Sequence, residues 1–467
     1  MSAPIRPGDA DVQAIVDRGF GSLAGARFLL LRVVDGAAAR QWLASLAFAS
    51  LAQAKTQRLD RVRQVAFTAA GLGALGMPPA DIAGFAPEFV DGLAGDPSRS
   101  RRLGDTGPNA PEHWLWGGAA ETEPHILLML LASADDIAAF EAETLAAMPA
   151  AACTLLLANA SNGALGREPF GFADGLSQPE FDWDDRITPG GAPDRIYRNR
   201  LKLGELLLGH ANEYGFVADY PQANGLGLNG SYLVYRQIEQ DVTGFWRWLA
   251  DVAGENGAMA LAETMLGRRA DGDPLPGLDA ANGDFTFGSD PDGRVCPVGA
   301  HIRRANPRSG DDPNGRHGFF ADLISSLGLK GAPMHDAVAS ARFHRLVRRG
   351  RAYGPMLAPL DAMRSVDAGA ESGLHFVALN ASLSRQFEFV QGAWVANAYF
   401  AGLSGEQDPL IGSRMPDPGG RATDAFHYCT AQGDPRLLTG LPRFVTVKGG
   451  AYFFLPGLGG LAWILNQ

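Results

Sequence analysis

The chain has 467 residues, of which 46% are hydrophobic and 19% are charged, and it carries a formal net charge of -11. This negative charge argues against a nucleic-acid-binding surface, which needs a basic face, and it disfavours docking on anionic membranes. Glycine (59 residues) and proline (30 residues) are abundant, while aliphatic and aromatic residues stay plentiful throughout. We therefore expect a large globular protein with long, ordered loops.

The cysteines and the first residues bear on the cellular compartment. Cys153, Cys296 and Cys429 are widely spaced, so they indicate neither a disulfide framework nor a metal site, and they favour a reducing compartment. Residues 1–20 contain no apolar signal-peptide core, and no apolar stretch approaches the length of a membrane span. We therefore expect a cytoplasmic protein.

Four stretches combine a short aliphatic run with an amphipathic helical pattern directly after it. The strands are expected at residues 26–34, 124–132, 231–237 and 374–380. Ser133 is the expected N-cap of the second helix, and the fourth helix is expected to begin near Ser382. Each unit buries an apolar run and covers it with an amphipathic helix.

Two such units in each half of the chain predict a duplicated α+β fold, with antiparallel sheets and helices packed on their outer faces. Strand-helix pairs recur in many folds, so the four units alone do not establish a duplication. A stretch rich in glycine, proline and aspartate lies between Asp182 and Gly230. It gives the expected division into an N-terminal domain, residues 1–220, and a C-terminal domain, residues 221–467.

One carboxylate stands out in "REPFGFADGLSQPEF", residues 167–181. Asp174 lies in a mostly uncharged segment with Gly171 and Gly175 on its two sides. An Asp-Gly pair is a strong turn signal, because Asp bonds its own backbone there. The alternative is that the backbone is bent to aim this carboxylate at a ligand.

One histidine also stands out, in "CPVGAHIRRANPR", residues 296–308. Small residues lead into His301, and Arg303, Arg304 and Arg308 follow it. Small neighbours would let a large flat ligand approach, and arginines would suit its carboxylates. The alternative is a histidine beside a solvated basic run, since a lone histidine is a weak metal signal. No zinc spacing, phosphate loop or serine-hydrolase motif is present.

A third element is the basic run "RLVRRGRAYGP", residues 345–355. Such a run is most often a solvated face. One of its arginines could instead point inward, where it would need an anionic partner, because an unpaired buried charge is costly.

Taken in order, "GFADG", "AHIRRANPR", "RLVRRGRAYG" and "LNASLSRQFEFVQGAW" resemble the dye-decolorising peroxidases, as does "QVAFTAAGLGALGMPP" nearer the N-terminus. The resemblance covers most of the chain. It implies a duplicated ferredoxin-like fold, haem b as cofactor, and a peroxidase that reduces hydrogen peroxide and oxidises organic donors such as dyes and phenolics through a ferryl intermediate. It also implies association between copies of the chain.

The resemblance assigns roles by position. Asp174 matches the distal acid/base, His301 the proximal haem ligand and Arg348 the distal arginine, while Leu374 and Phe376 match apolar residues of the distal pocket. Arg303, beside His301, joins the expected cofactor-binding set. Activity is then expected to be strongest at mildly acidic pH and to fail as Asp174 becomes protonated. The competing function is a haem-binding or haem-handling protein on the same fold, which needs neither Asp174 nor a distal arginine.

Two assignments stay open at this point. An insertion around residues 309–340 separates His301 from the basic run, which leaves Arg349 as a second candidate for the distal arginine. A proximal histidine normally donates its second N–H to a carboxylate. An aspartate is expected near position 382, but Ser382 stands there, and Glu388 or a backbone carbonyl could replace it.

Bulky donors cannot reach a buried haem, so their oxidation would pass through aromatic residues nearer the surface. Tyr353 and Trp394 lie close in sequence to pocket elements. They are candidates for this role, or equally for packed core residues.

Overall fold

The computed structural model describes residues 8–184, 186, 200–278, 280–281, 284–285, 287, 289–308, 341–365, 370–430 and 432–467. The expected insertion at residues 309–340 therefore lies outside the described residues. None of the described helices combines the length and the apolar character that a membrane crossing requires. All three cysteines are free thiols, as expected.

The first half of the chain forms four antiparallel strands in the spatial order β4-β1-β3-β2. Two helices, α1 and α7, connect them in the chain order βαββαβ, which is the ferredoxin-like arrangement. The elements are β1 (Gly25–Val33), α1 (Gly36–Ala44), β2 (Val62–Phe67), β3 (Ile126–Ala132), α7 (Ile137–Ala146) and β4 (Cys153–Ala160).

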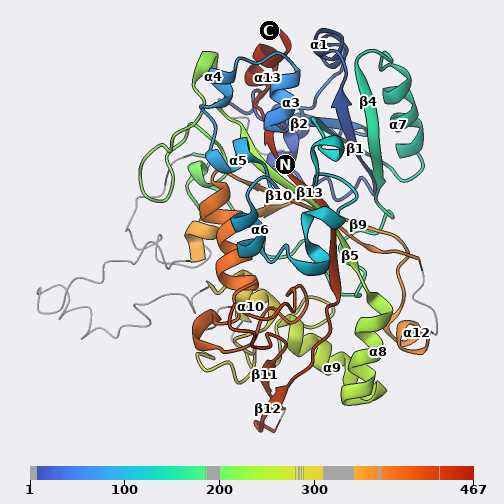
Figure 1. Cartoon of the computed structure of the whole chain (residues 1–467), viewed down its shortest axis with the longest axis vertical. Helices are drawn as coiled ribbons and strands as arrows, with labels where there is room; N and C mark the ends of the chain where they lie inside the picture. The colour runs from blue at the N-terminus through green and yellow to red at the C-terminus, as the bar shows by residue number, and fades with distance from the viewer. Residues whose placement is uncertain are drawn as a thin grey trace, which may run out of the picture.

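The second half repeats this arrangement in the order β13-β5-β10-β8, with β9 also paired to β10 (Figure 1). Its elements are β5 (Ser231–Gln240), α8 (Val242–Ala253), α9 (Glu255–Leu266), β8 (Val347–Arg348), β9 (Arg351–Tyr353), β10 (Gly373–Asn380), the π-helical η10 (Leu383–Glu388) and η11 (Val390–Val395), and β13 (Val445–Leu455). Phe67 of β2 pairs with Phe454 of β13, so the two four-stranded units form one continuous sheet. The repeated strand order confirms the predicted duplicated α+β fold. The exact division at residue 220 stays a prediction.

Shorter elements complete the chain. The remaining α-helices are α2 (Leu51–Thr56), α3 (Ala69–Ala74), α4 (Pro79–Ile82), α5 (Pro87–Asp91), α6 (Pro97–Leu103), α10 (His301–Ala305), α12 (Pro359–Arg364) and α13 (Leu458–Leu465). The small strands are β6 (Ala280–Ala281), β7 (Asp284–Phe285), β11 (Phe426–Cys429) and β12 (Pro435–Leu438). The 3-10 helices are η1 (Ala14–Val16), η2 (Gly107–Asn109), η3 (Pro111–His113), η4 (Ala120–Thr122), η6 (Leu203–Glu205), η7 (Ala223–Gly225), η9 (Ala341–His344) and η12 (Phe400–Gly402).

All four predicted strands are present, each within three residues of its expected bounds. The fourth helix, η10, begins next to Ser382 as expected, and the side chain of Ser382 caps it by accepting the N–H of Arg385. The prediction for Ser133 was wrong. Its carbonyl accepts the N–H groups of Asp136 and Ile137, so a turn follows β3 and α7 begins only at Ile137.

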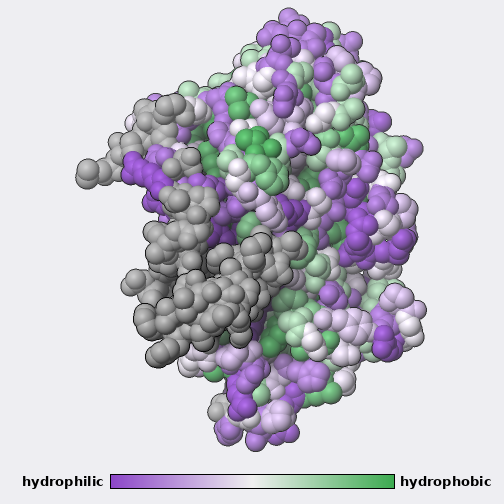
Figure 2. Space-filling model, turned by 90° about the vertical axis from the view of Figure 1, so that its left-hand side faces the viewer, coloured by the Kyte–Doolittle hydropathy of each residue, from purple (hydrophilic) through white to green (hydrophobic). Residues whose placement is uncertain are grey.

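Helix α8 shows why the helices cover the sheet. Its buried side chains include Phe245, Trp246 and Leu249, which recur at helical spacing and form one apolar face. Phe245 packs against Phe444 and Phe170, with ring centroids 5.1 and 4.4 Å apart. On the face of the molecule shown in Figure 2, hydrophobic residues lie in small groups among hydrophilic ones. The apolar residues are therefore concentrated between the sheet and the helices that cover it.

His375, in the middle of β10, is buried in an aromatic cluster. Its ring stacks on Tyr353 at 4.6 Å between centroids, and Nδ1 accepts the hydroxyl of Tyr235 at 3.1 Å. Nε2 lies 3.3 Å from the carbonyl oxygen of Ala160 and donates to it. Burial lowers the pKa of His375 to about 4, so the ring is neutral in the folded protein at pH 7.

The unfolded chain takes up a proton on this histidine near pH 6.5, whereas the folded protein does so only near pH 4. Its contribution to stability is therefore complete above pH 6.5 and is lost as the pH falls toward 4. The free energy of unfolding of the parent should fall between pH 7 and pH 4.5. We expect this fall to be about 2 kcal/mol smaller in the His375→Gln variant. Urea unfolding of the apoprotein at both pH values measures this difference. The exposed His113, changed to Gln, serves as control, and parallel pH dependences for parent and His375→Gln would contradict the prediction.

Candidate active site

His301 is the first residue of α10, and Asp290 folds the segment that leads to it. One carboxylate oxygen of Asp290 accepts the N–H groups of Arg294 (2.7 Å) and Val295 (3.1 Å), and the other accepts that of Cys296 (2.8 Å). A single buried carboxylate thus fixes three consecutive backbone amides. This turn positions the start of α10.

The arginines after His301 are committed to the protein itself. The guanidinium of Arg303 pairs with Asp290 at 3.2 Å and donates to the carbonyls of Asp290, Pro291 and Cys296. This geometry does not favour the predicted contact of Arg303 with a cofactor. Arg304 is fully buried and donates to the carbonyls of Gly299, Trp394, Asn397 and Glu406. It therefore ties α10 to the end of η11 and to the segment that follows η12.

His301 is oriented by a carboxylate far away in the sequence. Its Nδ1 donates to Oδ2 of Asp408 at 2.9 Å, and Asp408 is completely buried. The other oxygen of Asp408 accepts the N–H groups of Leu410 (2.9 Å) and Ile411 (3.0 Å). With Nδ1 carrying the proton, Nε2 presents a lone pair, and the side chain keeps 26% of its surface exposed. This is the arrangement expected of a histidine that ligates a metal.

The two groups shift each other's pKa in opposite directions. Burial opposes the charge on His301, but the Asp408 carboxylate outweighs it and raises the pKa of His301. Burial likewise opposes ionisation of Asp408, but His301 and the backbone amides outweigh it and hold the pKa of Asp408 below its usual value. The carboxylate of Asp408 is therefore ionised.

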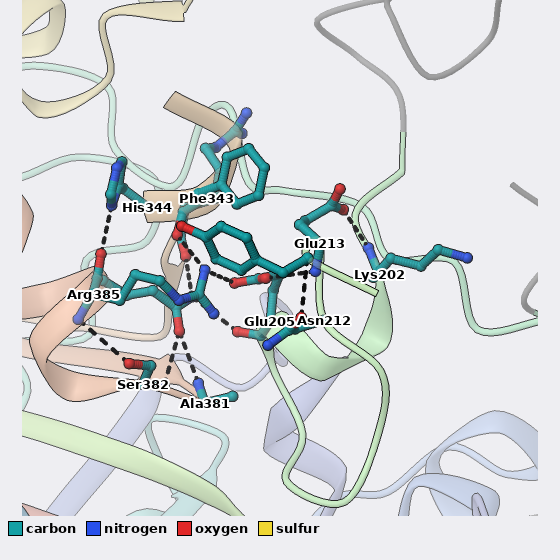
Figure 3. Close-up of polar contacts among 12 residues, drawn as sticks. Lys202, Glu205, Asn212, Glu213, Phe343, His344, Ala381, Ser382 and Arg385 are labelled. Carbon is teal, nitrogen blue, oxygen red and sulfur yellow. Dashed lines mark hydrogen bonds and ion pairs between the residues drawn. The ribbon is translucent and has the colours of Figure 1, made fainter. Parts of the chain in front are cut away.

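Neither residue considered from the sequence is this partner. Ser382 lies beneath Arg385, whose guanidinium reaches Glu205 at 2.6 Å (Figure 3). Glu388 pairs with Arg99 at 2.8 Å and accepts the hydroxyl of Tyr452 at 3.0 Å. Both side chains hold η10 in place, and the carboxylate comes instead from the loop after η12.

Gly299, two residues before His301, makes room for a different group than the sequence suggested. A Cβ at Gly299 would lie 1.8 Å from Oε1 of Glu406, which is fully buried. The other carboxylate oxygen of Glu406 accepts from the ring of His427 at 2.7 Å. The absence of a side chain at this position admits a carboxylate, whereas the sequence suggested a flat ligand.

The Asp174 loop is a turn, as its sequence indicates. Gly171 and Gly175 have φ values of +103° and +79°, which other residues rarely adopt. The N–H of Ala173 donates to the carbonyl of Ala270, and that of Asp174 donates to the carbonyl of Gly166, both at 2.9 Å. The backbone on both sides of Asp174 is thereby fixed, and its side chain is exposed to a cavity.

Glu168 lies inside the same loop and was not singled out from the sequence. Its carboxylate accepts the N–H groups of Phe170 (3.0 Å) and Phe172 (2.9 Å) and the side-chain amide of Gln240 (2.6 Å). Burial raises the pKa of Glu168 to about 7, and the charge of Asp174 adds to this rise. Two carboxylates thus lie within electrostatic range of each other in this loop.

The two candidate distal arginines differ in where their guanidinium groups go. Arg348 donates to the carbonyl of Leu176 at 2.6 Å, directly after Asp174-Gly175. Arg349 donates to the carbonyls of Ile15 (2.8 Å) and Val16 (2.9 Å) in the N-terminal segment. Arg348 is therefore the arginine tied to the Asp174 loop.

A cavity of about 730 Å³ brings these groups together. Asp174, Arg348, Arg349 and Trp183 are among the residues that line it. His301 is not among them, but both Arg348 and Glu168 lie within electrostatic range of His301. Arg348 and the loop residue Glu168 are therefore near enough to influence the charge of His301.

Leu374 and Phe376 lie on β10 opposite Ile238 and Arg236 of β5. Because side chains alternate along a strand, they share one face of the sheet with Ala378, which pairs with Arg348. Phe376 lines a separate cavity of about 80 Å³, and Leu374 lines neither cavity. The structure thus places the two side chains on the Arg348 face of the sheet.

A cluster of basic side chains surrounds Ser177, just beyond Asp174. Its hydroxyl accepts from Arg268 at 2.8 Å and from Arg308 at 2.9 Å, and its carbonyl accepts from Arg345 at 3.2 Å. Ser177 itself has a φ of +53°. Several guanidinium groups around one hydroxyl form a donor set suited to carboxylates.

The candidate aromatic residues are both largely buried. Tyr353 donates its hydroxyl to Glu371 at 3.0 Å and stacks on His375. Trp394 contacts His344 and Phe389 edge-on, each with ring centroids 5.2 Å apart. The hydroxyl of Tyr353 thus contacts a group at the surface, because the side chain of Glu371 is exposed.

Comparison with known proteins identifies the family. The chain is 32% identical over 424 residues to the multifunctional dye peroxidase DyP2 of Amycolatopsis sp., covering 84% of this chain and 80% of that protein. It is 31% identical over 337 residues to the dye-decolorizing peroxidase msp1 of Mycetinis scorodonius, covering 64% of this chain and 57% of that protein. No protein-family model matches the sequence.

The fold agrees with solved structures. The fungal DyP-type peroxidase from Auricularia auricula-judae superposes with a TM-score of 0.73 at 25% identity, over 99% of this chain and 100% of that chain. The chain therefore belongs to the dye-decolorising peroxidases, the family that the sequence motifs resemble. It is a haem-dependent peroxidase that oxidises organic donors.

The assignment of Asp408 as the partner of His301 can be tested against Ser382, the position at which an aspartate was expected from the sequence. Asp408→Asn keeps the shape but removes the charge that orients His301, so we expect haem affinity to fall about 10-fold to 100-fold. Ser382→Ala, the matched control, should cost about 1 kcal/mol of stability through loss of a cap and leave haem affinity unchanged. Haem titration of the apoproteins measures both. Equal affinities for Asp408→Asn and the parent would contradict the assignment.

Proposed function

We propose that the peroxidase reaction takes place between His301 and the Asp174 loop, with haem b as the cofactor. The single observation that carries this proposal is the bond from His301 Nδ1 to Asp408, because it leaves Nε2 as the ligating atom. Arg348 lies within electrostatic range of this histidine and is tied to the loop that carries Asp174. One side of the site thus has a ligand, and the other has an acid/base and a cation.

The residues present fit this cofactor. His301 would ligate the iron, and the guanidinium groups of Arg268, Arg308 and Arg345 around Ser177 would meet the two propionate groups of haem b. Arg308 was among the arginines considered for such carboxylates from the sequence. Arg303 is better explained by its bonds to the 290–296 segment.

When bound, the haem supplies an iron centre at which peroxide is reduced and from which an organic donor is oxidised. The carboxylate of Asp174 takes the proton that leaves the attacking peroxide and returns it to the oxygen that departs as water. The guanidinium of Arg348 stabilises the negative charge that develops on the breaking O–O bond. The Arg348 bond to Leu176 keeps this cation beside the Asp174 loop.

Donors would reach the site in two ways. Small phenolics would enter the cavity of about 730 Å³ that Asp174 and Arg348 line. Bulkier donors would be oxidised through Tyr353, whose hydroxyl has the exposed carboxylate of Glu371 as proton acceptor. Trp394 has no comparable contact with an exposed proton acceptor among the described residues and is better explained by packing.

A cytoplasmic location is part of the proposal and is supported by the three free cysteines. Association between copies of the chain, and the absence of nucleic-acid and membrane partners, stay predictions.

Asp174→Asn tests the acid/base role. Loss of the carboxylate should slow the change of the haem absorbance spectrum after one equivalent of hydrogen peroxide by at least about 100-fold, because proton transfer then lacks its carrier. The spectrum before peroxide should match the parent, since Asp174 does not hold the cofactor. Stopped-flow absorbance measures the rate. A variant as fast as the parent would overturn the role.

Arg348 and Arg349 can be separated by matched substitutions. Arg348→Lys should lower the rate of the same spectral change about 100-fold, because a fixed planar cation is lost. Arg349→Lys should lower the melting temperature through lost bonds to Ile15 and Val16 and change the peroxide rate far less. The reverse pattern would make Arg349 the distal arginine.

A further inference from the structure

Glu168 is the central contact of the loop that carries Asp174. Its side chain receives hydrogen bonds from the N–H groups of Phe170 and Phe172 and from the amide of Gln240. Its own N–H donates to the carbonyl of Phe172, and its carbonyl accepts the N–H of Gly171. Backbone and side chain of one residue therefore close the loop from Glu168 to Phe172.

The closed loop is anchored on the haem-binding half of the chain. Gln240 is the last residue of β5, and Trp246 of α8 donates its indole N–H to the carbonyl of Phe170 at 3.0 Å. Phe170 and Phe172 are buried, and Phe170 stacks within 4.4 Å of Phe245. These contacts join the loop, β5 and α8 into one packed body.

Asp174 follows directly from this body. The bonds from Ala173 to Ala270 and from Asp174 to Gly166 fix the backbone, while no described hydrogen bond fixes the Asp174 side chain. The place of its carboxylate therefore depends on the backbone, which these two bonds hold on one side and the loop closed at Glu168 holds directly before Ala173.

We propose that Glu168 is a positioning residue for peroxide cleavage, which holds the Asp174 loop in the orientation that the proton transfer requires. The inference rests on the proposed role of Asp174. A misplacement of about 1 Å in a reacting group can cost about 100-fold in rate. The loss of the contacts that hold this loop can therefore slow peroxide cleavage strongly.

A carboxylate suits this position better than an amide. Its two oxygens carry several lone pairs and no N–H, so they can meet all three donors at once, and both oxygens still accept when the group is protonated. A glutamine would direct an NH₂ group at one of those donors and leave a backbone amide without an acceptor, which costs about 1–3 kcal/mol when buried. The loop would then open at Phe170 or Phe172.

The test is the Glu168→Gln variant of the haem-loaded protein. We expect kcat/KM for hydrogen peroxide to fall about 30-fold, and kcat/KM for a phenolic donor to stay within about two-fold of the parent, because only the peroxide step needs an oriented Asp174. In both apoprotein and holoprotein, the amides of Phe170, Phe172 and Asp174 should exchange with deuterium faster. An unchanged peroxide constant, or an equal fall in both constants, would overturn the proposal.

Asp417→Asn is the matched control. Asp417 also accepts two backbone N–H groups of its own loop, from Gly419 and Arg421, and receives the hydroxyl of Tyr399. Its loss should open that loop and leave both kinetic constants unchanged. A fall in the peroxide constant equal to that of Glu168→Gln would show that the effect is general and would overturn the proposal.

A second variant covers failure of Glu168→Gln to fold. Gln240→Leu removes only the outer hydrogen bond and should lower the peroxide constant about five-fold with faster exchange at Phe170, an effect that corresponds to one hydrogen bond. A parent-like constant in this variant would overturn the proposal. Failure of the proposed role of Asp174 would give a different result from failure of this proposal. In that case the parent would not respond to peroxide, or Asp174→Asn would respond at the parent rate.

Discussion

The hydrogen bond from His301 to Asp408 is the constraint around which the C-terminal half of the protein is organised. A fully buried carboxylate is expensive unless it is paired and hydrogen-bonded. Asp408 meets that requirement with the imidazole and with two backbone amides. The same bond fixes the tautomer of His301 and leaves the lone pair on Nε2.

The neighbouring arginines make this geometry rigid. Arg304 joins α10 to η11 and to the segment of Glu406, and Arg414 donates to the carbonyls of Asp408 and Pro409. Burial lowers the pKa of Arg414 to about 10. Donors to carbonyls on several segments thus hold the histidine helix and its carboxylate in one unit.

The opposite side of the site is built by other means. The Asp174 loop is closed by Glu168 and held at Leu176 and Ser177 by arginines from three separate segments. Its glycines supply the positive φ values, and its phenylalanines supply the anchor on α8. The Asp174 loop is rich in glycine and proline, but these contacts hold it in one defined turn.

The sequence by itself determined the local features: the strands and the helices that follow them, the Asp-Gly turn at Asp174, the start of a helix near Ser382, and the family that the motifs resemble. These features depend on residue spacing and on secondary-structure propensity over a few neighbouring residues, and both can be read directly from the sequence. The partner of His301 depends on residues 107 positions apart, and no local pattern marks Asp408 among the other acidic residues. Ser133 failed as a cap because a turn competed for its position, and Gly299 proved to admit Glu406. Only the tertiary structure decided which arginine faces the loop and which carboxylate orients the histidine, because each of those choices is a balance of burial and pairing between distant segments.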